Sequence, residues 1–194
     1  SFPTGISWDG TNTSWVGNAN DKLFLQSGQF TSTIKDSQSV AAVDATPTGI
    51  SSGTTNTPWT GQDGRLYLQS GQFASTLKTS LAVGSIDTLP QGVSWDGTNS
   101  PWIGTGSDKQ YLTSGQFTST LKTSRGVAGF DLSPHDISWD GTNTPWVGNA
   151  GDKLFLTSGQ FSSTIKTSQS TTTFESNPQG IETNNYAKRL ALVA

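Results

Sequence analysis

The sequence predicts an all-β repeat protein, and two observations lead to that prediction. The first is a segment found in four versions, most clearly as ISWDGTNTPWVG at positions 137–148. The branched residue that opens it recurs at positions 6, 50, 93, 137 and 181, in steps of 44, 43, 44 and 44 residues. The second is the composition, which is 31% hydrophobic and 13% charged, rich in Ser, Thr and Gly, with seven Trp and nine Phe. That mixture is typical of many short strands joined by tight turns.

Each repeat is interpreted as four short strands. In the first repeat we expect strands at 5–8, around Trp15 and Val16, at 22–25 and at 30–35. The pair Asp9-Gly10 is a strong turn signal after the first of them. β-branched and aromatic residues favour strand over helix, and no segment before position 184 carries the start and stop signals of a useful helix.

Four strands in about 44 residues match the size of a β-propeller blade. The sequence therefore predicts a small four-bladed propeller at 1–177, with units at 3–46, 47–89, 90–133 and 134–177. Residues 178–194 begin a fifth copy at Gly180 and then diverge. This C-terminal segment either closes the ring or pairs with another subunit, since both outcomes cover an exposed strand edge.

The repeat also resembles a known class of blades. Its order of Gly-Ile-Ser-Trp-Asp-Gly-Thr-Asn, then Trp-Val-Gly, then Asp-Lys-Leu-Phe-Leu, is similar to NHL and regucalcin-like propellers over residues 3–177. Residues 7–11 loosely resemble an Asp-box turn. The Gly-His and Trp-Asp signatures of WD-repeat blades are missing from their usual places. These resemblances imply the propeller fold and no enzymatic role.

Trp-Asp-Gly segments are the most attractive candidate ligand sites. An indole face can stack on a sugar while a carboxylate accepts its hydroxyl hydrogens. The residues in question occur in three of the four repeats: Trp8, Asp9, Trp95, Asp96, Trp139 and Asp140. The second repeat has Ser52 and Gly53 instead. Blade packing plus a hairpin turn explains the same residues, and we give that interpretation more weight.

A second Trp occurs in every repeat, at positions 15, 59, 102 and 146. Because it persists where the second repeat loses the first Trp, we expect it to be core. The Asp residues that precede a Pro by three positions are expected to cap a turn. They are Asp44, Asp87 and Asp131.

No catalytic group stands out from the repeats. His135 is the single His, and we interpret it as a solvated linker residue. Paired carboxylates for glycoside cleavage must converge in one cleft, and the two Glu residues, Glu175 and Glu182, both lie near the end of the chain.

Asp21-Lys22 and its repeats are expected to be a solvated edge, because exposed ion pairs contribute about 0–1 kcal/mol to stability. Asn12 begins a weak N-glycosylation triplet.

The net charge and the composition argue against several classes of function. The net charge is −3 without a basic cluster, which argues against nucleic-acid binding. There is no Cys, and no apolar run reaches the length of a membrane span. We expect no cofactor and no metal, because no EF-hand or nonapeptide Gly-Asp repeat is present. The missing initial Met indicates that the chain begins after processing or trimming.

The sequence thus favours a non-catalytic structural or assembly module of an extracellular or virion surface, self-associating, and able to form a fibre, through 178–194. The alternative is a multivalent lectin whose partners are glycans. A hydrolytic propeller enzyme is the least favoured hypothesis, because the repeats do not bring acids or a nucleophile together at one place.

Overall fold

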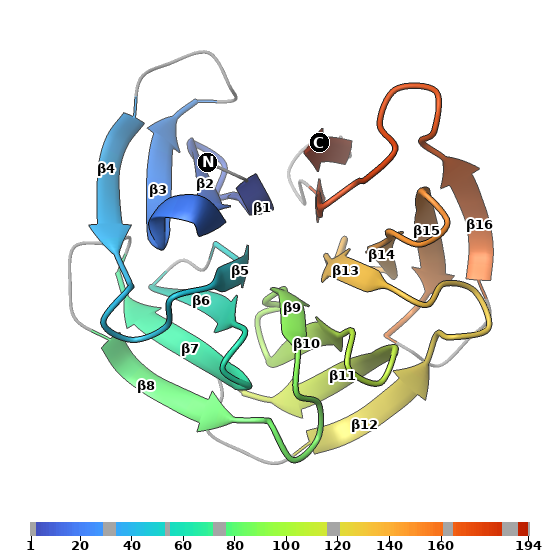
Figure 1. Ribbon diagram of the computed structural model, residues 1–194, viewed down its shortest axis with the longest axis horizontal. Helices are drawn as coiled ribbons and strands as arrows, with labels where there is room; N and C mark the ends of the chain where they lie inside the picture. Colours follow the sequence, from blue (N-terminus) through green and yellow to red (C-terminus); the bar gives the residue numbers. More distant parts are fainter. Residues whose placement is uncertain are drawn as a thin grey trace.

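The computed structural model describes residues 3–28, 34–52, 55–71, 77–115, 121–160, 165–183 and 190–193. It is an all-β, four-bladed β-propeller, in which each blade is a four-stranded antiparallel sheet (Figure 1). The helical content of the described residues is one 3-10 turn, η1 (Asn18–Asn20). The predicted fold class is confirmed.

The first, second, third and fourth strands of each blade run in that order from the centre of the ring to its outside (Figure 1). The innermost strands are β1 (Pro3–Trp8), β5 (Pro47–Ile50), β9 (Pro90–Val93) and β13 (Pro134–Ile137). The second strands are β2 (Asn12–Gly17), β6 (Asn56–Gly61), β10 (Asn99–Gly104) and β14 (Asn143–Gly148). The third strands are β3 (Lys22–Ser27), β7 (Arg65–Ser70), β11 (Lys109–Ser114) and β15 (Lys153–Ser158). The outer strands are β4 (Ile34–Ser39), β8 (Leu77–Ala82), β12 (Leu121–Gly126) and β16 (Ile165–Ser170).

The outer strand begins later than the sequence predicts. We expected it at 30–35, whereas β4 runs from Ile34 to Ser39, and residues 29–33 lie outside the described part. The register with β3 explains the shift, because Lys22 pairs with Ser39 and Gln26 with Ile34. The pairing partner, rather than the alternation within the segment, sets the boundary of this strand.

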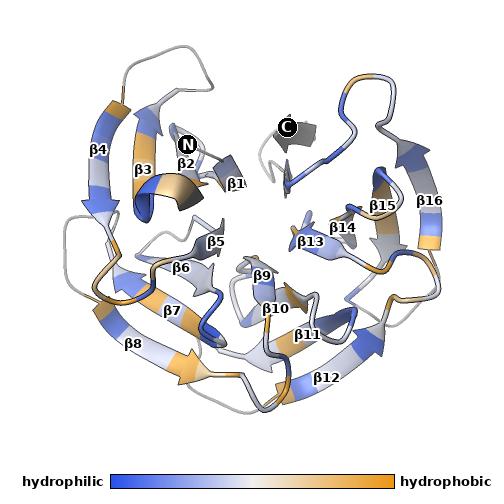
Figure 2. Ribbon diagram, in the orientation of Figure 1, coloured by the Kyte–Doolittle hydropathy of each residue, from blue (hydrophilic) through white to orange (hydrophobic). Residues whose placement is uncertain are grey.

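Hydrophobic clusters lie between neighbouring blades. One cluster joins Val16, Leu23, Leu25 and Val40 of the first blade to Ile50, Trp59 and Tyr67 of the second. The third strands carry much of this apolar surface, visible as orange segments of β3, β7, β11 and β15 (Figure 2). Since the cluster takes residues from both blades, a single blade cannot bury its own apolar face.

The fifth copy forms a separate two-stranded sheet. β17 (Gly180–Thr183) pairs antiparallel with β18 (Leu190–Val193), with Ile181 opposite Leu192. β17 contacts both β13 and β1, so it fills the gap in the inner ring between the last blade and the first (Figure 1). This sheet does not merge with either neighbouring blade, and whether the C-terminal segment closes the ring or pairs with another subunit stays a prediction.

Candidate functional site: the repeated turns and the seam

The Trp-Asp-Gly turns are closed by their own carboxylate. Asp9 Oδ1 accepts hydrogen bonds from the backbone N–H groups of Thr11 (2.7 Å) and Asn12 (2.6 Å). The next residue, Gly10, has φ of 97°, a conformation that favours glycine. The same pair of bonds forms at Asp96 (2.7 and 2.5 Å) and at Asp140 (2.8 and 2.5 Å). These Asp residues therefore act as turn caps, in agreement with the packing interpretation.

The second oxygen of each turn Asp also has a partner. Asn12 Nδ2 donates to Asp9 Oδ2 (3.2 Å), and Lys35 Nζ donates to Asn12 Oδ1 (3.1 Å). The third and fourth blades repeat this Asp–Asn–Lys chain, and the second blade keeps Lys78 and Asn56 (3.4 Å). Glycosylation of Asn12 stays a prediction, at a side chain that is 7% exposed in the folded chain.

The two sets of Trp differ in burial. Trp8 ends β1, whereas Trp95 and Trp139 lie two residues after the ends of β9 and β13, and all three are partly exposed. The second set stacks on an aromatic residue of the third strand, with ring centroids 4.0–4.1 Å apart. Three of its members, Trp59, Trp102 and Trp146, are fully buried, whereas Trp15 is partly buried. The core prediction is confirmed for those three.

Buried Asp residues clamp each blade to the next. Asp87 Oδ1 accepts from the Leu89 N–H (2.9 Å), which closes the predicted turn. The same carboxylate accepts from the N–H groups of Gly106 (3.1 Å) and Ser107 (3.0 Å) and from the Tyr111 hydroxyl (3.2 Å), all in the following blade. Asp44 and Asp131 cap the same turn and accept from the next blade in the same way. The turn-cap prediction is confirmed, and the clamp across blades was not foreseen.

Within the described residues, the predicted solvated edge at Asp21-Lys22 and its repeats forms no salt bridge, and the single His lies elsewhere than expected. The salt bridge found within the described residues joins Arg65 to Asp63 (3.7 Å), not Asp21 to Lys22 or their repeats. His135 is not a linker residue, because it lies within β13 and is partly buried. Burial lowers the pKa of His135, and the charge of Asp131 opposes that shift.

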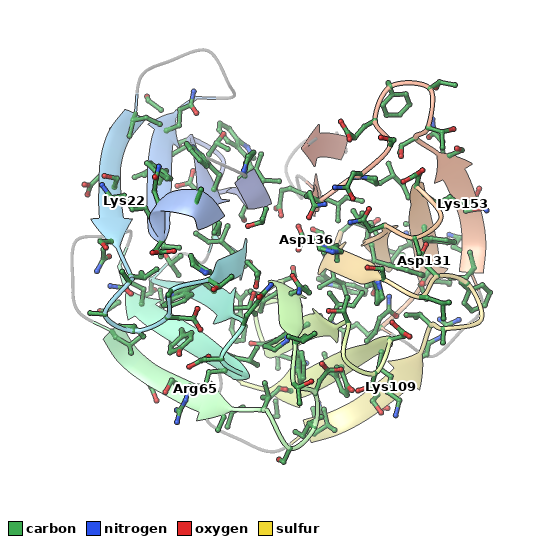
Figure 3. The ribbon with its side chains drawn as sticks, viewed as in Figure 1. Lys22, Arg65, Lys109, Asp131, Asp136 and Lys153 are labelled. Atoms are coloured by element: carbon green, nitrogen blue, oxygen red, sulfur yellow. The ribbon has the colours of Figure 1, made fainter. Side chains whose placement is uncertain are left out.

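Inner-strand glycines allow neighbouring blades to approach closely. A Cβ at Gly49 would lie 2.7 Å from Gly92 Cα, and one at Gly92 would lie 2.5 Å from Asp136 Cα. Asp136 is the one acidic residue at this position of the repeat. It is 2% exposed and lies near the centre of the ring (Figure 3). Its Oδ1 accepts from the Ile137 N–H (2.9 Å) and its Oδ2 from the Ile181 N–H (3.0 Å), so it ties β13 to β17.

Glu182 stands where the other copies have Ser. Ser7 Oγ accepts from the Ser52 N–H of the next blade (2.7 Å), and Ser51 Oγ accepts from the Trp95 N–H (3.1 Å). The Glu182 carboxyl makes the corresponding bond to the Trp8 N–H and also accepts from the Ser7 hydroxyl. Ser138 Oγ donates to Glu182 Oε2 (3.5 Å). Glu182 thereby connects β17 to both of its neighbours.

The two acids of the seam have displaced pKa values. Burial raises the pKa of Asp136 well above its ordinary value, although two backbone N–H donors oppose the shift. Burial also raises the pKa of Glu182, and the charge of Asp136 adds to it. Sequence reasoning did not select these residues as a site. The available signal was that each breaks the repeat, Asp136 replacing Gly and Glu182 replacing Ser.

The described residues hold no group of three or more His, Cys, Asp or Glu side chains placed to bind a metal ion. Within the same ranges, no helix is long and apolar enough to cross a membrane. Both acids of the seam accept hydrogen bonds from the strands around them. Chemically, the arrangement can hold a proton and fix the position of β17.

No family model matches this chain, and no curated protein matches it. Solved structures do resemble it. Glutaminyl cyclase from Myxococcus xanthus superposes with a TM-score of 0.79 at 10% identity, covering 100% of this chain and 85% of that one. A propeller from a nidogen/laminin complex gives 0.67 at 14% identity, covering 93% and 67%. A streptogramin B lyase gives 0.66 at 13% identity, covering 98% of this chain and 61% of that one. At these identities the likeness defines the fold alone: the chain is a β-propeller repeat protein.

Proposed function

We propose that this protein is a non-catalytic assembly module of an extracellular or virion surface, related in its blade pattern to NHL and regucalcin-like propellers. It associates with copies of itself through the C-terminal sheet. The observation that supports this most directly is the edge of β18. Within the described ranges, β18 pairs with β17 on one side and with no strand on the other.

A comparison with the outer strands distinguishes this edge. β4, β8, β12 and β16 also have one unpaired side, but each contains a Lys and at least one Ser or Thr. Such residues discourage pairing with another chain. β18 has the sequence LALV, with neither a charge nor a polar side chain. A short apolar strand with a free edge is a template for strand addition.

The repeated polar groups support a structural role. The turn carboxylates Asp9, Asp96 and Asp140 cap turns of their own blades, and Asp96 also accepts from Gln160 of the fourth blade. Asp44, Asp87 and Asp131 bridge to the next blade. Some structural neighbours are enzymes by name, but a shared propeller does not carry an activity from one protein to another.

Light scattering coupled to size exclusion tests the assembly. We expect the chain to form oligomers whose mass rises with concentration, and Ala191→Lys in β18 to abolish them. The matched control is Ser168→Lys, which places the same charge on the exposed outer strand β16 and should leave assembly intact. Monomers at every concentration, or assembly that survives Ala191→Lys, would refute the proposal.

A second function, multivalent glycan binding, is favoured by the partial exposure of Trp8, Trp95 and Trp139. The indole faces are the available stacking surface, because the adjacent Asp residues cap their turns. Binding to a glycan array that is lost in Trp95→Ala and Trp139→Ala, with unchanged circular dichroism, would support it. Absence of any binding by the wild-type chain would eliminate it.

A further inference from the structure

The seam between the last blade and the first is held by two acidic residues that have no counterpart in the other junctions. Asp136 accepts the Ile181 N–H from one side of β17. Glu182, on β17 itself, reaches the Trp8 N–H, the Ser7 hydroxyl and the Ser138 hydroxyl. β17 is therefore attached through one carboxyl on β13 and another that it carries itself.

We propose that Asp136 and Glu182 form a protonation-dependent latch that seats β17 between β13 and β1. The latch is closed while the pair retains a proton, and it loosens when both carboxyls are ionised. This inference concerns closure of the ring and does not depend on whether β18 pairs with another chain.

The described strands that pack against the pair supply no compensating positive charge. β17 packs against β1, β13, β14 and β18, and β13 packs in addition against β9 and β10. None of these strands contains Lys or Arg. Apart from the pair, His135 is their one titratable side chain, and burial lowers its pKa. A second negative charge, on the partly buried Glu182, would therefore lie beside the buried Asp136 carboxylate without a counter-ion on these strands, which is costly.

Hydrogen bonding explains how one proton on the pair keeps β17 attached. Asp136 has both oxygens occupied by backbone N–H donors, which suits a carboxylate. The Glu182 carboxyl, when protonated, can donate to a neighbouring Ser hydroxyl and still accept from the Trp8 N–H. Protonation of the pair thus removes the repulsion between the acids while the bonds that attach β17 remain available.

The sign of the pH dependence follows from the direction of the pKa shifts. Both carboxyls have a higher pKa in the folded ring than their ordinary values near 4. The closed seam then binds more protons than the open one, so closure is most favourable at pH values below about 4. It weakens as the pH rises from there through the raised pKa values, by up to about tenfold in the opening equilibrium per pH unit for one linked proton.

Amide hydrogen exchange at a series of pH values tests the latch. After correction for intrinsic exchange rates, we expect the protection of the Ile181 and Trp8 amides to fall as the pH rises. The Trp95 amide, bonded to Ser51 in a regular junction, is the internal reference and should keep its protection. Equal pH dependence at Ile181 and Trp95, or none at Ile181, would overturn the proposal.

Glu182→Gln removes one charge of the pair, so the protection of the Ile181 amide should fall less steeply as the pH rises. Loss of one linked proton lowers the change by up to about tenfold per pH unit. Glu175→Gln, in the connection before β17, is the matched control and should exchange like the wild type. If Glu182→Gln does not fold, Asp136→Asn gives the same test from the other partner. A pH dependence that keeps its full wild-type steepness in the folded variant would refute the latch, whatever the light-scattering result for β18.

Discussion

The three regular junctions and the seam solve the same packing problem with different residues. At the regular junctions a glycine lets the inner strands approach closely, and a buried Asp clamps the following turn. At the first two of them a Ser also accepts an N–H of the next blade. At the seam, Asp136 replaces the Gly and Glu182 replaces the Ser. The clamp position holds Glu175, whose Oε1 accepts from the nearby Asn177 N–H (2.9 Å).

The hydrophobic clusters of the regular junctions also differ from the one at the seam. Among the described residues, the clusters between complete blades contain seven, six and six buried hydrophobic residues. The cluster that includes β17 contains three, namely Val147, Leu154 and Ile181. A regular junction is therefore held mainly by buried apolar surface, and the described part of the seam adds the polar bonds of Asp136 and Glu182. A polar junction of this kind is the one that protonation can affect.

Adding a methyl group to the inner ring should separate the two kinds of junction most strongly. At Gly49 an added Cβ would lie 2.3 Å from the Gln91 carbonyl oxygen, so we expect Gly49→Ala to cost on the order of 4 kcal/mol. At Gly180 the nearest atom is Ile6 Cγ2 at 3.3 Å, and the cost should stay below about 1 kcal/mol. Urea denaturation measures both, and equal costs would contradict the difference in closeness.

Truncating the branched residue compares the two cores. Ile137 and Ile181 occupy the same place in the repeat and are 1% and 2% exposed. Ile137→Ala should cost about 3 kcal/mol of global stability, because a cavity opens in a six-residue cluster. Ile181→Ala should cost less, since the seam can open without unfolding the blades. A larger effect at Ile181 in denaturant titrations would reverse our ranking of the junctions.

Removing the clamp carboxylate should give the smallest contrast. Asp87→Ala leaves several N–H and hydroxyl donors of the next blade without their acceptor, and we expect a loss of about 2 kcal/mol. Glu175→Ala should change stability by less than about 0.5 kcal/mol, because its bond is exposed. Thermal unfolding followed by circular dichroism checks this pair. Comparable shifts in Tm would show that the seam has a clamp of equal strength.

Short-range sequence patterns were sufficient to predict most of the fold. The period of 43 or 44 residues, the Asp-Gly turns and the aromatic third strands were sufficient to predict four-stranded blades around a ring. The buried Trp set and the turn-capping Asp residues were predicted for the same reason. Each depends on neighbours within a few residues or on a position that recurs in every copy.

The sequence by itself determined the blade, because the chemistry of a turn and the alternation of a strand act over short distances. Only the tertiary structure decided what happens between the first blade and the last. It placed Asp136, Glu182 and Trp8 together across β13, β17 and β1, although they are far apart in the chain. Ring closure sets these distances, and no repeat pattern encodes them, since the seam is where the pattern stops.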